Sequence, residues 1–285
     1  MNAIDTTVRV NQPRLKSVVE PPKGLPKPDL RGVWAYRDLF YFLVRRDLAV
    51  VYKQTAFGVA WAVLRPLVLA AIYAVIFGVV LEVPSEGIPF PVFVISGLTL
   101  WLFFSTAVPK AASSTIANAD LIAKVYFPRL VIPLAAVVPP LVDFAIGFLV
   151  LEVVLLAYGI TPQPEQVFVI PVVLVLIAMT TGAGLLLSAI AVRFRDIDIV
   201  VPFILQILLF ASAVLYPLSL LPGHLQPFFA INPLVGIMET FRAAMLPVGG
   251  IDLLQILPGA FVGVLLIAGG LLYFARVERT IADVI

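Results

Sequence analysis

The sequence contains no cysteine and only one histidine. The lack of cysteine excludes disulfide bonds, thiol catalysis and cysteine-ligated metal. Because His224 is the only histidine, we expect neither a Ser/His catalytic arrangement nor a histidine-ligated metal site within one chain. Charged residues make up only 13% of the chain, whereas about a quarter of the residues in a soluble domain are charged. These shortages argue against a soluble enzyme.

A nucleotide-binding phosphate loop of the form G-x-x-x-x-G-K-[ST] is also missing from the sequence. A transporter without this loop must take its energy from an ATP-binding partner or from an ion gradient. We therefore expect no catalytic residue, no metal and no cofactor to be bound by this chain.

Apolar residues, in contrast, are abundant: they account for 61% of the chain, and the mean hydropathy is +1.08. A segment of about 20 predominantly apolar residues is long enough to cross a bilayer as a helix. Six such segments occur, at 59–81, 91–108, 130–158, 167–191, 200–221 and 254–275. The sequence therefore predicts an all-α integral membrane protein with six transmembrane helices. The third span is long enough to tilt, or to break at Pro139 and Pro140.

The residues before the first span fall into two parts. Residues 1–31 are polar and rich in proline, which predicts a flexible cytoplasmic tail, and they lack the apolar stretch of a cleaved signal peptide. Residues 32–58 carry aromatic and basic residues at mainly helical spacing. This pattern indicates an amphipathic helix that lies in the membrane interface and contacts lipids. An ordinary surface helix is the alternative.

The distribution of Lys and Arg predicts the orientation of the chain. The N-terminal segment holds ten of these residues, the connection between the second and third spans three, the connection between the fourth and fifth two, and the C-terminal tail two. The connections on the opposite side hold a single one, Arg242. Because positive residues stay on the cytoplasmic side, we expect both termini in the cytoplasm and the chain in the plasma (inner) membrane.

The connection at 216–250 is apolar but too interrupted to span the membrane. Pro217, Pro222, Pro227, Pro233 and Pro247 break it, and the apolar stretches between such breakers are of the length seen in re-entrant or interfacial helices. We expect a re-entrant hairpin that enters the membrane from outside. A plain outer loop is the alternative.

The connection at 110–128 has a small, polar first half and an apolar second half. We expect a short cytoplasmic amphipathic helix with Ile122, Val125 and Tyr126 on one face. Such a helix is suited to docking in a groove of another protein. The alternative is a helix that rests on the inner leaflet.

Three ionisable residues fall inside the predicted spans, where a charge is costly unless it is paired or hydrated. They are Arg65, Asp143 near the centre of the third span, and Glu152. Their functional interpretation is a proton relay or a cation site; the structural one is pairing between helices, for which Arg65 and Asp143 are candidates. Three groups do not make a chain of acids across the membrane, which disfavours a proton-driven pump. The charged turn at 192–198, with Arg193 and Arg195, fits a solvated anchor better than a partner contact.

Several short stretches together resemble the ABC-type permeases that export polysaccharides. They are Arg46-Asp47-Leu48, Tyr52-Lys53-Gln54-Thr55 and Gly58 before the first span; Ser113-Ser114-Thr115-Ile116, Asn118, Leu121-Ile122, Lys124-Val125, Phe127-Pro128-Arg129 and Ile132-Pro133-Leu134 before the third; Phe194-Arg195-Asp196 after the fourth; and Asn232-Pro233 in the outer hairpin. The resemblance runs from about Tyr36 to the C-terminus. One departure is Val51, where many relatives have an arginine.

The resemblance implies a permease domain at 32–285 that forms a homodimer and joins two copies of a cytoplasmic ATP-binding subunit. ATP and magnesium would be bound by that partner. The implied cargo is a lipid-linked polysaccharide such as O-antigen on a polyprenyl diphosphate, with teichoic acid and capsule polymers as related cargoes; nucleic acid is not expected as a partner.

The resemblance also assigns roles to individual residues. The segment at 110–128 matches the coupling helix that contacts the ATPase, through Ile116, Asn118, Leu121, Ile122, Lys124 and Tyr126. The cargo's diphosphate headgroup would meet Arg45, Arg46 and Lys53 at the inner interface. Channel-lining aromatics would be Trp101, Phe103, Phe104, Tyr216, Phe228 and Phe229; an interfacial belt or helix packing is the alternative for these.

Other classes remain open at this point. An ABC-type exporter of another lipid, a drug or haem would share the topology. A gradient-driven carrier should show inverted repeats, and a membrane enzyme should show His/Asp clusters; the sequence has neither. As in the family, we expect the dimer to use the first and fifth spans, and Gly259 and Gly263 of the sixth span to pack within one subunit.

Overall fold

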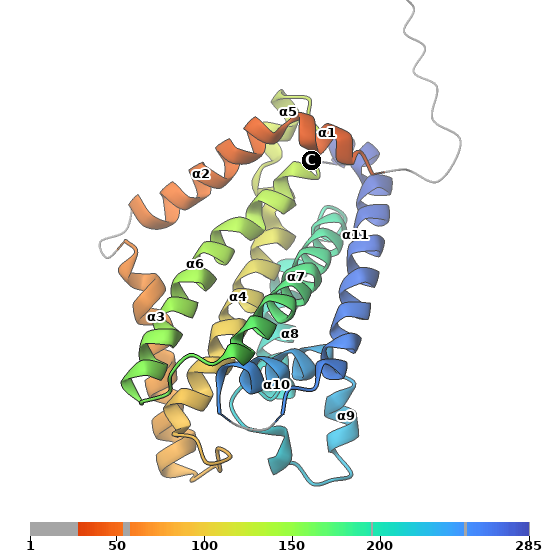
Figure 1. Ribbon diagram of the computed structural model, residues 1–285. Helices are drawn as coiled ribbons and strands as arrows, with labels where there is room; N and C mark the ends of the chain where they lie inside the picture. The colour runs from red at the N-terminus through yellow and green to blue at the C-terminus, as the bar shows by residue number, and fades with distance from the viewer. Residues whose placement is uncertain (1–27, 54–57, 195, 248–249, 285) are drawn as a thin grey trace, which may run out of the picture.

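The computed structural model describes residues 28–53, 58–194, 196–247 and 250–284. Most of the predicted tail at 1–31, and Arg195 of the predicted anchor turn, lie outside these residues. Within them, every regular element is a helix, and the longer helices run roughly side by side as a bundle (Figure 1). The prediction of an all-α fold is confirmed for these residues.

Five helical segments are long and apolar enough to cross a membrane, and they match five of the six predicted spans. The first is α3 (Ala60–Tyr73) continued by the π-helix η1 (Ala74–Val80). The others are α4 (Phe90–Ala117), α6 (Val131–Ala157), η2 (Pro164–Phe168) with α7 (Val169–Ala191), and η4 (Leu253–Ile256) with α11 (Leu257–Val284). Helix α6 runs through Pro139 and Pro140 without a break.

The predicted span at 200–221 is wrong in its bounds. Helix α8 covers Ile197–Ala211, which at 1.5 Å per residue is about 22 Å and shorter than the hydrocarbon core. The chain then turns, with Ala213 at a φ of 52°. The side-chain amide of Asn232 donates to the Ala211 carbonyl at 3.0 Å and to Ser212 Oγ at 2.9 Å. The first bond satisfies the Ala211 carbonyl at the end of α8, so this carbonyl does not need another helical turn after it to provide a donor.

One end of the bundle carries three short elements. Helices α1 (Leu30–Ala35) and α2 (Arg37–Lys53) lie there beside α5 (Ala119–Lys124), and the C-terminal end of α11 reaches the same end (Figure 1). A separate apolar cluster joins them: it includes Leu43 of α2, Ile122 of α5 and Phe274 of α11. Only Leu43 and Val44 of α2 are buried, so α2 covers the bundle with one narrow stripe.

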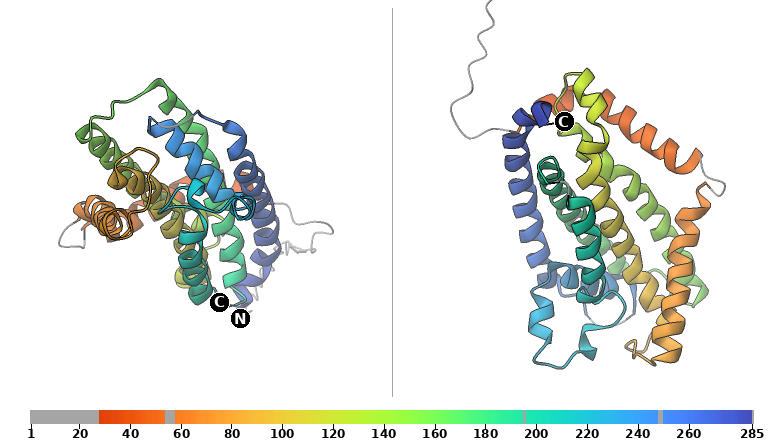
Figure 2. Two further views of the ribbon diagram at one scale, coloured as in Figure 1. Left: turned by 90° about the horizontal axis from the view of Figure 1, so that it is seen from below. Right: turned by 180° about the vertical axis from the view of Figure 1, so that it is seen from behind.

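Helix α4 is the centre of the main core. It packs against α3, α6, α7, α8 and α10, and most of its residues are buried, including the polar Ser96, Thr99 and Thr115. The view from behind in Figure 2 shows it running between its neighbours. The side-chain hydroxyl of Thr115 is 2.6 Å from that of Ser188 in α7, which satisfies two polar groups inside this core.

Helices α7 and α11 approach closely because glycines face each other. A Cβ added to Gly182 would lie 2.5 Å from the Ile267 nitrogen, and one on Gly270 would lie 3.0 Å from the Gly182 oxygen. Gly259 and Gly263 also face residues of the same subunit, Ile237 and Met179. The prediction that this pair packs within one subunit is confirmed.

The opposite end of the bundle is closed by the segment at 216–250. It contains η3 (Leu218–Leu220), α9 (Gln226–Ala230) and α10 (Pro233–Met245); residues 248–249 lie outside the description. Helix α10 lies across the lower end of the bundle in Figure 1 and packs on α4, α7 and α11. Nine of its 13 residues are buried, so it is part of the core rather than a loose outer loop.

Candidate functional site

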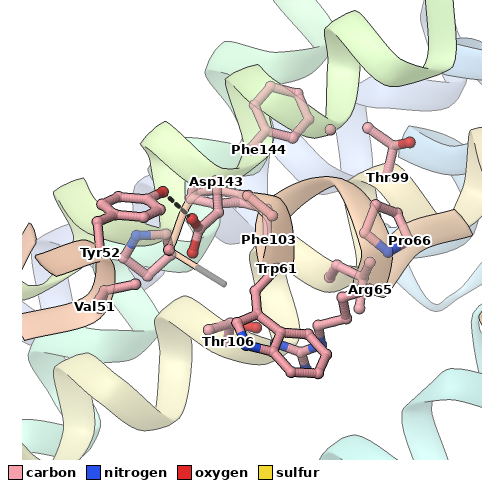
Figure 3. A pocket seen from close by; sticks show the side chains of 15 residues that line it. Val51, Tyr52, Trp61, Arg65, Pro66, Thr99, Phe103, Thr106, Asp143 and Phe144 are labelled. Carbon is pink, nitrogen blue, oxygen red and sulfur yellow. Dashed lines mark hydrogen bonds between the residues drawn. The ribbon is translucent and has the colours of Figure 1, made fainter. Parts of the chain in front are cut away.

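A cavity of about 180 Å³ lies where α2, α3, α4 and α6 meet. Tyr52 comes from the last turn of α2, Trp61 and Arg65 from the first turns of α3, and Asp143 from α6 (Figure 3). Apolar side chains form most of the remaining wall: Val51, Ala62, Pro66, Leu102, Phe103, Pro140 and Phe144. The cavity is therefore apolar with a few polar groups, as small-molecule sites generally are.

The Tyr52 hydroxyl donates a hydrogen bond to Asp143 Oδ1 across the cavity (Figure 3). Burial, together with this bond and the charge of Asp143, raises the pKa of Tyr52 well above its usual range. The hydroxyl therefore keeps its proton and remains a donor at any physiological pH. This bond fastens the end of α2 to the middle of α6.

Two of the three ionisable residues inside the predicted spans, Arg65 and Asp143, line this same cavity. Among the described residues, no ion pair joins them. Asp143 lies near the middle of α6, beside Tyr52 and the beginning of α3 (Figure 3). The 27 residues of α6 make about 40 Å, which exceeds the hydrocarbon core, so the predicted depth of Asp143 at the centre of a span stays a prediction.

The residues expected to meet a diphosphate headgroup do not converge on one point. Arg46 forms an ion pair with Asp47 at 2.8 Å and donates to Asn118 Oδ1 at 2.9 Å. Lys53, two turns later, shares the face of Arg46, while Arg45 is rotated by about 100°. All three side chains are exposed. Arg46 thus joins the predicted entry helix to the predicted coupling segment, a contact that the sequence did not suggest.

The predicted coupling segment is divided between two helices. Residues 110–117 are the last turns of α4, Asn118 caps the junction, and only 119–124 form the separate helix α5. The shared face expected for Ile122, Val125 and Tyr126 is wrong, because Ile122 is buried in the core while Tyr126, beyond the helix, is 92% exposed. The Tyr126 carbonyl accepts a 3.3 Å hydrogen bond from the Tyr36 hydroxyl. A contact between this segment and an ATPase stays a prediction.

The predicted channel aromatics separate into two groups. Trp101, Phe103 and Phe104 are buried within the subunit, where the rings of Trp101 and Phe104 are 6.1 Å apart. Phe228 is 70% exposed; Tyr216 and Phe229 are partly exposed. Helix packing therefore accounts for the first group inside one subunit, and a channel role stays a prediction.

A second polar site at the opposite end was missed in the sequence. Arg242 is only 3% exposed; it donates to the Val214 carbonyl at 2.6 Å, pairs with Glu239 at 3.1 Å and lies 3.9 Å from the centre of the Phe93 ring. Burial raises the pKa of Glu239, and the charge of Arg242 opposes that shift. The signal available in the sequence was an acid and a base three residues apart inside an otherwise apolar helix.

Comparison with known proteins extends these observations. The profile of the ABC-2 type transporter membrane family matches residues 38–246. An O-antigen export system permease protein, RfbA, of Myxococcus xanthus is 35% identical over 217 residues, covering 75% of this chain and 82% of that protein. An RfbA of Klebsiella pneumoniae is 31% identical over 249 residues, covering 87% of this chain and 95% of that protein. The polysialic acid transport protein KpsM of Escherichia coli is 27% identical, covering 72% and 80%. The chain therefore belongs to the ABC-2 type transporter family of membrane permeases.

Proposed function

We propose that this chain is the membrane subunit of an ATP-driven exporter that moves a polyprenyl-diphosphate-linked polysaccharide, such as O-antigen, across the inner membrane. The observation that carries the proposal is the 31% identity to an O-antigen export permease over 95% of that protein's length. The alternative within the family is an exporter of another lipid, a drug or haem.

The energy would come from a separate ATPase subunit, which binds ATP and magnesium. The chain's own lack of a phosphate loop supports this. Two permease chains and two ATPase subunits would make the complete exporter, because a wide glycan path needs more helices than one subunit has. Helix α5 and the exposed Tyr126 would face the ATPase at the cytoplasmic end.

Six crossings are the topology that we infer, with α8 as the fifth. Helix α2 and the C-terminal end of α11 lie at the same end of the bundle (Figure 1), and a chain that begins and ends on one side crosses an even number of times. Five long spans therefore require α8 as a sixth crossing. A helix as short as α8 is enough for a crossing if α9 and α10 form a re-entrant hairpin that fills the outer side of the membrane next to its end. The end with α2 and α5 carries most Lys and Arg residues, which supports a cytoplasmic location for it.

The function is tested by deleting the gene in its host and following the polysaccharide. We expect the surface polymer to disappear and the lipid-linked polymer to accumulate on the cytoplasmic face, with recovery when the intact gene is supplied. Recovery should fail if the ATPase partner carries an inactivating substitution. Normal amounts of surface polymer in the deletion strain would contradict the proposal and favour another cargo.

The same assay tests the headgroup residues. Arg45→Gln with Lys53→Gln leaves eight of the ten N-terminal basic residues, so orientation should be kept while export falls several-fold. Arg46 is left intact because its loss would also break the contact with Asn118. Arg31→Gln is the control, since it removes a basic residue outside the predicted cluster. Equal export by the double variant and the control would show that these residues only anchor the segment and do not bind the headgroup.

A further inference from the structure

The cavity beside α3 has chemistry that export of an anionic cargo does not explain. It reaches the surface of the subunit, because Trp61, which lines it, is 53% exposed and Arg65 is exposed as well. The surrounding face of α3 is apolar and exposed, with Val68 at 52% and Ile72 at 48%. A ligand could therefore reach the cavity from within the bilayer.

Its walls carry one positive and one negative group on different helices. Arg65 comes from α3 and Asp143 from α6 (Figure 3). Tyr52 occupies Oδ1 of Asp143, but a carboxylate can accept several hydrogen bonds through its two oxygens. Charges in such an apolar setting are costly unless they find partners. A ligand that carries a negative and a positive group would pair with Arg65 and Asp143 at the same time.

We propose that this cavity binds the zwitterionic headgroup of a membrane phospholipid with a primary ammonium, of the phosphatidylethanolamine class. The phosphate would accept hydrogen bonds from the Arg65 guanidinium, and the ammonium would donate to Asp143. The acyl chains would lie along the exposed apolar face of α3.

The size and depth of the cavity fit this ligand. A volume of about 180 Å³ lies below the range of roughly 300–1,000 Å³ for drug-sized ligands, so it suits a headgroup and not a whole lipid or a sugar chain. The cavity is lined by the last turn of α2 and the first two turns of α3 (Figure 3). A headgroup would therefore meet it from the end of the bundle at which the first predicted span begins.

The negative wall distinguishes this ligand from the cargo. A polyprenyl diphosphate has no cationic group for Asp143, and the carboxylate would repel it. The two ligands therefore predict opposite effects of removing the negative charge. A phospholipid with an ammonium should bind less well without it, while an anionic headgroup should bind as well or better.

Trp61 provides a direct reporter of binding. The purified full-length permease is mixed in detergent with lipids brominated on the acyl chains near the headgroup, and the quenching lost in Trp61→Phe is taken as the signal from this site. We expect half-maximal quenching at a lower mole fraction of phosphatidylethanolamine than of phosphatidylcholine, whose ammonium has no N–H donor, or of phosphatidylglycerol, which has no ammonium. Equal quenching by all three lipids would overturn the proposal, whatever the variants do.

Two variants then test the charges. Asp143→Asn keeps the shape and an acceptor for Tyr52, and we expect it to weaken phosphatidylethanolamine binding roughly fivefold or more, to the level of phosphatidylcholine. Arg65→Gln should weaken binding of all three phospholipids. Glu152→Gln, a carboxylate change on α6 outside the cavity, is the matched control and should change nothing. Unchanged lipid preference in Asp143→Asn, or tighter binding of phosphatidylglycerol to wild type than of phosphatidylethanolamine, would contradict the proposal and make this an anion site.

Discussion

At the scale of single residues, Arg242 is a buried cation that contacts three parts of the bundle. Its guanidinium contacts the turn after α8 through Val214, the same helix through Glu239, and α4 through the Phe93 ring. Gly97 makes room for it, because a Cβ there would lie 2.6 Å from both Arg242 Nη2 and the Val214 oxygen. One buried cation thus holds α10, α4 and the end of α8 together.

Arg242→Met is therefore predicted to destabilise the permease strongly. It leaves the partly buried Glu239 without its partner, and breaking one side of a fully buried ion pair costs about 3–5 kcal/mol, which is an upper bound for this pair. The thermal unfolding temperature of the purified protein in detergent measures this. The double variant Arg242→Met with Glu239→Gln should recover part of the loss, because no unpaired charge remains. An unfolding temperature equal to that of wild type in the single variant would show that this cluster does not hold the outer end.

At the scale of elements, contacts join α2 to the junction of α4 and α5. The sequence predicted these as two separate segments, the interfacial helix and the coupling helix. Arg46 bonds Asn118, and Tyr36 bonds the carbonyl of Tyr126. A displacement of α5 by an ATPase would therefore be transmitted to α2. The Tyr52–Asp143 bond extends this connection to α6.

Tyr126→Asp tests docking on the ATPase without disturbing the folding of the permease. Tyr126 is 92% exposed, so the variant should fold normally, whereas a charge in an apolar docking groove should abolish co-purification with the ATPase. Ile122→Asp would not distinguish the two effects, because Ile122 is 7% exposed and its replacement would first destabilise the core. Tyr158→Asp, at the exposed end of α6 on the opposite side of the bundle, is the control. Normal co-purification and normal coupled ATPase activity of Tyr126→Asp would remove this residue from the interface.

At the scale of the whole molecule, the bundle has a tight centre and incompletely covered outer helices. Helix α4 is largely buried, while only Val201 and Leu205 of α8 are. Large apolar side chains are exposed along α3, α8 and α11. In a membrane these faces contact lipid or a second copy of the chain. The dimer seam expected at the first and fifth spans stays a prediction.

The number of crossings is tested by labelling from outside. Because the chain has no cysteine, a single introduced cysteine reports its own side of the membrane. We expect a membrane-impermeant maleimide applied to the periplasmic side to label His224→Cys and not Ala123→Cys. Both side chains are exposed in the subunit, so accessibility within the fold does not separate them. Labelling of both positions from one side would show that α8 does not cross.

The sequence alone determined the membrane class, five of the spans and the family resemblance, because apolar runs of bilayer length and the bias of positive charge are local properties of the chain. The tertiary structure decided where α8 ends, since the Asn232 amide that satisfies its last carbonyl comes from 21 residues further along. It also decided that Ile122 is core and Tyr126 is surface, that Asp143 bonds Tyr52, and that Arg242 is buried. Each of these depends on a partner from another helix, and helical periodicity carries no information about which helices become neighbours.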